Sequence, residues 1–482
     1  MIFMSINTHD YENDVRVMTG AFYPGEKIVI EDSEECNLKV MVTVLGNHII
    51  GKIILGNNEL GFDTVSEVDT QGAVRNLLKR ELYGIFSKLT GKTLPWGTLT
   101  GIRPIKIPLA LVEQGMKDED IKSHFKSEYL VNDNKAELGL KVAQNEHKLL
   151  QKIDYKNGYS LYIGIPFCPT TCLYCSFTSY PISMWKDRVD LYLDALFKEL
   201  LYLSELLKDK KPDSIYIGGG TPTTLLPHQF ERLFDFLYAH FDVGHAKEFT
   251  VEAGRPDSID KDKLQMIRKY GIDRISVNPQ TMNQKTLDFI GRRHTVEDVR
   301  KAFLLARECG FDNINMDLIV GLPGETKSDV QYTLDEVNKL DPDSLTVHSL
   351  AIKRAAALNM FKERYEDCHI ENTDEIMDMT YDFAIEKGYE PYYLYRQKNM
   401  AGNLENVGYA KPGKAGIYNI LIMEEKQSIF AAGANSQSKI VFHDENRVER
   451  IENVKDVTNY IDRVSEMIER KRAFFHGKNE LR

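Results

Sequence analysis

The chain of 482 residues lacks any run of about 18 apolar residues, so it offers no candidate for a membrane-spanning helix. Its first ten residues have neither a basic lead nor an apolar segment, which is unlike a secretory signal. Basic residues are also in the minority: 61 Lys and Arg against 72 Asp and Glu give a net charge of −11. We therefore expect a cytoplasmic protein with neither a membrane nor a nucleic acid as partner.

Cysteine is scarce, and six residues in a chain of this length exclude a disulfide framework. Three of the six are scattered, whereas Cys168, Cys172 and Cys175 lie within eight positions, spaced C-x3-C-x2-C. Thiolates packed so closely share a soft metal or react with each other, and a cytosolic setting favours the metal.

The sequence pattern divides the chain into residues 1–155, 156–352 and 353–482. The first part predicts an α+β domain, with a small antiparallel sheet followed by helices from Asp69 and over Ile107–Ile153. The strands expected in this sheet are Val15–Phe22, Lys27–Ile30, Leu38–Leu45 and Ile49–Leu55. The last part predicts an α+β extension that ends in an amphipathic helix over Val454–Ile468.

The middle part alternates short apolar strands with helical stretches, which predicts a parallel sheet with right-handed crossovers. Six such units are two short of a full (β/α)8 barrel, so the expected fold is α/β, a partial (β/α)6 barrel with its chemistry at the carboxyl ends of the strands. The six expected strands are Leu161–Phe167, Ser214–Ile217, Glu248–Ala253, Arg274–Asn278, Asn313–Val320 and Ser344–Leu350.

The cysteine motif follows the first of these strands. Zinc usually takes four ligands in paired C-x2-C units, and no fourth candidate lies nearby. Three thiolates on a tight loop suit a [4Fe-4S] cluster with one iron left open for a small molecule, which is a catalytic arrangement. Zinc and incidental cysteines are the alternatives.

The run from Tyr162 to Cys168, with Cys172 and Cys175, resembles the signature of radical S-adenosylmethionine (SAM) enzymes. More narrowly, the chain is similar to the oxygen-independent coproporphyrinogen III oxidase family, and the segment Trp96–Pro104 resembles the HemZ-like branch. The resemblance implies a radical-SAM barrel in which the three cysteines hold a [4Fe-4S] cluster and the open iron chelates SAM. It also implies that Tyr162 lies beside the cluster.

A glycine run, Gly218–Gly220, ends the second expected strand and permits close approach of a ligand to the backbone. By itself a tight turn is the commoner explanation. Likewise, an isolated acid in a strand, such as Asp317, either faces a ligand or pairs with a core Arg. The resemblance implies a SAM site at residues matching the family's contacts: Gly219, Gly220, Thr221, Glu252, Gln280, Arg292 and Asp317.

The implied activity is oxidative decarboxylation of coproporphyrinogen III to protoporphyrinogen IX without oxygen, by a SAM-derived 5′-deoxyadenosyl radical. Such a radical SAM oxidoreductase needs a tetrapyrrole substrate, an electron donor such as flavodoxin or ferredoxin, and an electron acceptor that the sequence does not identify. One departure is Phe177, where the best-known oxidases have a fourth cysteine. A heme-binding chaperone and an anaerobic heme-modifying methyltransferase therefore remain alternatives. Candidate contacts to substrate carboxylates are Arg103, Lys106, Lys353, Arg354 and Arg396.

Overall fold

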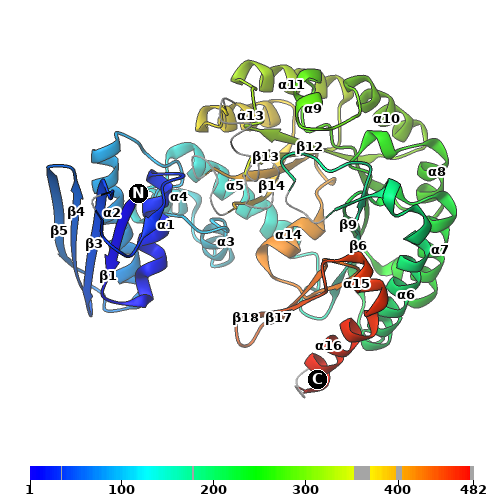
Figure 1. Cartoon of the computed structure of the whole chain (residues 1–482), viewed down its shortest axis with the longest axis horizontal. Helices are drawn as coiled ribbons and strands as arrows, with labels where there is room; N and C mark the ends of the chain where they lie inside the picture. The colour runs from blue at the N-terminus through cyan, green and yellow to red at the C-terminus, as the bar shows by residue number, and fades with distance from the viewer. Residues whose placement is uncertain (34, 176–178, 352–369, 398–403, 478–482) are drawn as a thin grey trace.

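The structure is a computed structural model that describes residues 1–33, 35–175, 179–351, 370–397 and 404–477. The N-terminal part is a five-stranded sheet in the order β2-β1-β3-β4-β5, with helices α1 (Glu12–Phe22) and α2 (Gln71–Thr90) packed on one face (Figure 1). Its strands are β1 (Ile2–Ile6), β2 (Ile28–Val29), β3 (Leu38–Leu45), β4 (His48–Leu55) and β5 (Asn58–Val65).

Two predictions for this domain are wrong. The segment Val15–Phe22 lies inside helix α1, because Val15, Met18, Thr19 and Phe22 recur at helical spacing and are the buried residues of that helix. The sheet is mixed rather than antiparallel, since β1 runs parallel to both of its neighbours. Strands β1 and β5 were not predicted.

The middle of the chain forms the expected parallel sheet, and each of the six predicted strands is found within two residues of its expected ends. These strands are β6 (Tyr159–Ile165), β9 (Pro212–Gly219), β10 (Glu248–Glu252), β11 (Arg274–Ser276), β12 (Asn313–Val320) and β13 (Ser344–Ser349). Each pairs with the next in parallel, so all their carboxyl ends meet at one edge of the sheet. The α/β partial barrel is confirmed.

Helices that follow the parallel strands form an arc outside the sheet, at the right and top of Figure 1. The arc consists of α6 (Val189–Leu206), α7 (Pro227–His240), α8 (Lys261–Lys269), α9 (Gln284–Phe289), α10 (Val296–Glu308) and α11 (Lys327–Leu340). None of the helices in the described ranges is long and apolar enough to cross a membrane.

The C-terminal part extends this sheet to eleven strands rather than standing apart from it. Strand β16 (Ile429–Ala432) pairs in parallel with β6 and is followed outward by β17 (Gln437–Phe442) and β18 (Arg447–Glu452). At the opposite edge, β15 (Asn406–Ala410) and β14 (Glu390–Tyr395) follow β13. The final amphipathic helix is found as two helices, α15 (Val457–Asp462) and α16 (Val464–Gly477).

Buried side chains form two large cores. One contains residues 2–94, and the other begins at Trp96 and runs through the barrel. Helices α3 (Lys106–Glu113), α4 (Asp118–Tyr129) and α5 (Asp133–Leu150) therefore contribute to the barrel core, and α5 contacts β14. The predicted domain boundaries stay predictions, and the two cores favour a first boundary near residue 95 rather than 155.

Candidate functional site at the carboxyl ends of the strands

The inner face of the barrel is polar because the polar residues of neighbouring strands occupy the same alternate positions. Neighbouring strands align Tyr162 with Tyr216, and Tyr216 with Thr250. Two residues further along, Glu252 aligns with Ser276. Because alternate residues share a face of a strand, these side chains line the interior while Leu, Ile and Val at the intervening positions join the core under the helices. The register thus brings together residues that the chain separates by about one βα unit each.

Tyr162 is part of a stack of three tyrosines inside the barrel. Its ring is 6.3 Å from that of Tyr216 and 6.2 Å from that of Tyr418, both nearly parallel, and the latter two rings are 4.4 Å apart. Tyr418 belongs to α14 (Ile417–Glu424), whose first backbone N–H groups, at Ile417 and Tyr418, donate to the Glu248 carboxylate. Helix α14 therefore covers the amino-end opening of the barrel.

Glu252 ends strand β10 and accepts a hydrogen bond from Tyr216 Oη at 2.6 Å. Burial, with a smaller contribution from the nearby charge of Asp317, raises the pKa of Glu252 to about 7, although the hydrogen bonds from Tyr216 and the Gly219 backbone act in the opposite direction. Its carboxyl group can thus serve as donor or acceptor near neutral pH.

Asp317 in β12 is held by two amides: Asn278 Nδ2 donates to Oδ2 and Asn315 Nδ2 donates to Oδ1, both at 2.7 Å. His348 Nε2 lies 3.8 Å from Oδ2. Burial by itself would raise the pKa of Asp317, but these polar contacts, led by His348, outweigh it and lower the pKa. The contacts recorded for the described residues therefore do not bear out the alternative of a core Arg partner.

The glycine run is required by the approach of β9 to the end of β6. The Gly220 N–H donates to Ile165 O at 2.7 Å, and a Cβ at Gly220 would lie 2.5 Å from Phe167 O. Gly219 has φ +110°, which an L side chain rarely adopts. The run therefore supports the start of the cysteine loop directly.

Cys168 begins the loop in the short strand β7 (Phe167–Cys168), which pairs with β8 (Tyr180–Pro181). Thr221 Oγ1 donates to Cys168 Sγ at 3.5 Å, and Arg255 Nη1 donates to Cys172 Sγ at the same distance. Among the described residues, no three His, Cys, Asp or Glu side chains are grouped to hold a single metal ion. Phe177 lies outside the described residues, as do Lys353 and Arg354.

Arg292 lies between the cysteine loop and the strand ends, whereas Gln280 lies beside helix α11. Arg292 donates to Tyr174 Oη at 3.1 Å and to the carbonyls of Asn278 and Gly254, so it joins the cysteine loop to the strand ends. Gln280 has a positive φ of 68° and lines a small cavity between β12 and α11, with Thr333 among its neighbours. The structure thus groups Gln280 with residues under the helices rather than with Glu252.

A model of the radical SAM superfamily matches residues 162–337. The oxygen-independent coproporphyrinogen-III oxidase-like protein HemZ of Bacillus subtilis (strain 168) is 41% identical over 411 residues, which are 84% of this chain and 82% of HemZ. The chain belongs to the HemZ-like branch of the radical SAM superfamily. The expected cofactors, a [4Fe-4S] cluster and SAM, are those of this superfamily.

The chain is also similar to a heme chaperone and to a coproporphyrinogen III oxidase. The heme chaperone HemW of the same organism is 32% identical over 310 residues, covering 64% of this chain and 76% of HemW. The solved structure of coproporphyrinogen III oxidase (HemN) from Escherichia coli matches with a TM-score of 0.53 at 24% identity, over 67% of this chain and 73% of HemN. The structural likeness confirms the fold.

The residues of the HemZ-like site fit a polar ligand inside the barrel. Two of its buried polar atoms, Ser276 Oγ and Arg292 Nε, have no hydrogen-bond partner among the described residues. Unpaired buried polar atoms are costly, and a bound molecule with both donors and acceptors removes that cost. Ser276 and Arg292 lie with the residues around Glu252 and Asn278, where SAM is expected.

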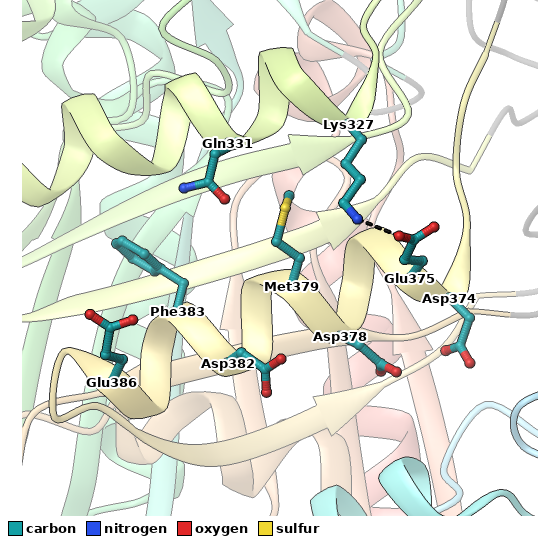
Figure 2. Close-up of a pocket in the computed structure, with 9 residues that line it drawn as sticks. All are labelled: Lys327, Gln331, Asp374, Glu375, Asp378, Met379, Asp382, Phe383 and Glu386. Atoms are coloured by element: carbon teal, nitrogen blue, oxygen red, sulfur yellow. Dashed lines mark hydrogen bonds and ion pairs between the residues drawn. The ribbon is translucent and has the colours of Figure 1, made fainter.

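A second hollow lies outside the barrel, between α11 and α13 (Asp374–Glu386), and Figure 2 shows its acidic lining. Its carboxylates follow one face of α13 at four-residue spacing, and Lys327 pairs with Glu375 across it. None of the predicted site residues lines this groove. It is separate from the cysteine loop and the polar interior.

Several residues of the site were missed from the sequence. Asn278 and His348 contact Asp317, Tyr216 contacts Glu252, and Arg255 contacts Cys172. For Asn278 and Tyr216 a signal exists, because each lies on a predicted strand in phase with a predicted site residue. For Arg255 no periodic signal exists, since it lies in a turn after β10.

Proposed function

We propose that this protein catalyses the oxygen-independent oxidative decarboxylation of coproporphyrinogen III to protoporphyrinogen IX. The observation that carries the proposal is where the HemZ-like segment Trp96–Pro104 lies. Arg396, which follows β14, donates from its backbone to Ile102 O at 2.8 Å and from its side chain to Leu99 O. Strand β14 runs in the same direction as β13, so this contact is at the carboxyl-end edge of the sheet.

The segment is thereby close to the polar interior. Tyr395, next to Arg396, has its hydroxyl 3.3 Å from His348 Nδ1, and His348 approaches Asp317. At the other end of the segment, Trp96 Nε1 donates to Glu405 at 2.7 Å, just before β15. The branch-specific segment therefore borders the edge where the substrate of a barrel enzyme approaches.

In this proposal Cys168, Cys172 and Cys175 hold the cluster, and Glu252, Arg292 and Asp317 hold polar groups of SAM. When bound, the cluster and SAM supply the radical that removes a hydrogen atom from a substrate propionate. Asp317 stays ionised because its pKa is lowered, so it accepts hydrogen bonds from hydroxyl or ammonium groups. Tyr418 and α14 keep water from the amino-end opening.

Two cations suggested as contacts for substrate carboxylates are already engaged. Arg103 pairs with Glu425 at 3.0 Å and donates to the Met423 and Glu424 carbonyls. Arg396 is buried and donates to Leu99 O. Both therefore fix the Trp96–Pro104 segment, and the substrate carboxylates need other donors. An electron donor of the flavodoxin or ferredoxin class is part of the proposal.

A heme chaperone is the second candidate, supported by the similarity to HemW. The deciding experiment is anaerobic incubation of reconstituted protein with SAM, a reductant and either coproporphyrinogen III or heme, followed by mass spectrometry and a measurement of bound heme. Loss of one CO2 and two hydrogens per propionate, with one 5′-deoxyadenosine formed each time, is expected, and a Cys172→Ala protein should form neither product. An unchanged tetrapyrrole mass with stoichiometric heme binding would favour the chaperone, and gain of a methyl group the methyltransferase.

A further inference from the structure

We propose that Arg255 is a positioning residue that orients the Cys168–Cys175 loop and raises the reduction potential of the cluster bound there. Arg255 follows β10 and is 4% exposed. Its guanidinium donates three hydrogen bonds to the loop: Nη1 to Cys172 Sγ at 3.5 Å and to Thr170 O at 3.2 Å, and Nη2 to Thr170 Oγ1 at 3.1 Å. One cation thus contacts a ligating sulfur, a backbone carbonyl and a hydroxyl.

Asp257 fixes the direction of this guanidinium. Its carboxylate accepts from Arg255 Nε at 2.9 Å and from Nη2 at 2.7 Å, a bidentate pair. The Ser258 hydroxyl donates to Arg255 O at 2.6 Å and is itself linked to Thr223, which follows the glycine run. Because a guanidinium is planar and rigid, fixing one side aims Nη1 at the loop.

The position of the charge has a consequence for the cluster. Reduction adds one electron, and hence one negative charge, taken from a donor of the flavodoxin or ferredoxin class. Hydrogen bonds to the sulfurs and nearby charge set the potential of iron–sulfur clusters. A cation in contact with Cys172 stabilises the reduced form more than the oxidised form, and the low exposure of Arg255 limits screening by water.

This inference rests on the proposed ligation of the cluster by the three cysteines. The two proposals fail in different ways. A parent protein that forms no brown cluster refutes the ligation, whereas a cluster whose potential and iron content do not depend on Arg255 refutes only the role of Arg255.

The experiment compares Arg255→Gln, which removes the charge, with Arg255→Lys, which keeps the charge but lacks the planar guanidinium that donates to both Asp257 and the loop. The matched control is Arg232→Gln, because Arg232 also pairs with two carboxylates, Asp190 at 2.5 Å and Asp194 at 2.7 Å, but on the outer helices α6 and α7. Each protein is reconstituted anaerobically, its iron is counted, and its midpoint potential is measured by redox titration followed by electron paramagnetic resonance.

Arg255→Gln should lower the ratio of reduced to oxidised cluster about tenfold at a fixed donor potential, which is about 59 mV for one electron. Arg255→Lys should give a smaller shift, and Arg232→Gln none. A full cluster with the parent potential in Arg255→Gln would overturn the proposal. If Arg255→Gln holds no cluster, the Arg255→Lys protein decides. A lowered midpoint potential, or loss of iron from a protein that still folds, supports the role of Arg255. A full cluster with the parent potential refutes it.

Discussion

Lys135 is a buried cation among three carboxylates, and it joins helix α5, before the barrel, to helix α13 and the residue before β15, after the barrel. The side chain is 1% exposed, and Nζ lies 2.7 Å from Asp374, 2.6 Å from Asp378 and 3.0 Å from Glu405. Burial would lower the pKa of Lys135, but the three acids outweigh it and raise the pKa. Glu405 also accepts from Trp96 Nε1.

We expect Lys135→Met to reduce the free energy of unfolding by about 3–5 kcal/mol, because it leaves the buried Glu405 carboxylate and two partly buried aspartates without this cation. Lys126→Met is the matched control: Lys126 pairs with Asp133 at 2.5 Å, but the two side chains are 52% and 80% exposed, so a loss of about 0–1 kcal/mol is expected. Urea unfolding followed by fluorescence measures both, since Trp96 contacts the same network.

The pH dependence gives an independent check. Burial raises the pKa of Asp374 even though Lys135 acts in the opposite direction, and removing that cation raises the pKa further. The folded protein then binds more protons than the unfolded chain, so this part of its stability is lost as pH rises. The deficit of Lys135→Met should therefore be smaller at pH 5 than at pH 8. A loss below about 1 kcal/mol, or a deficit that grows on acidification, would refute the reasoning.

Four further outcomes are expected. Replacing each of the three loop cysteines with Ala should remove nearly all cluster iron, whereas Cys309→Ala should retain it. Asp317→Ala should keep the cluster but weaken SAM binding by about tenfold or more in equilibrium dialysis, since it removes a charged acceptor; unchanged binding would exclude Asp317 from the SAM site. Gly220→Ala should impair cluster retention, because its Cβ meets Phe167 O. Glu146 is fully buried, and burial followed by the charge of Glu424 raises its pKa, so its contribution to stability falls as pH rises. Glu146→Gln should therefore gain stability over the parent in thermal unfolding, and more at pH 8 than at pH 5.

The barrel could be predicted from the sequence because its strands are short apolar runs separated by helical stretches, and successive βα units lie side by side. The N-terminal segment Val15–Phe22 was misread because β-branched and aromatic residues also suit a strand, while its helical spacing decides the structure. The parallel insertion of β16 beside β6 could not be predicted, since it joins distant parts of the chain.

The same contrast holds for the site. Glu252 and Asp317 carry a signal along the chain, because Glu252 ends its strand and Asp317 is the one acid within the apolar strand β12. Arg255 and Lys135 carry none: the first contacts a residue 83 positions away and the second a residue 243 positions away, and only the folded chain brings these partners together.

The pairing of β6 with β16 has a consequence for synthesis on the ribosome. Ser160 in β6 donates to Gln427, 267 positions later, and the β16 register begins at Ile429. While the chain is still emerging, β6 presents an open hydrogen-bonding edge, and an open edge invites pairing between chains. A nascent or truncated chain that ends before β16 therefore carries its cysteine loop beside an unpaired strand edge that is prone to aggregation.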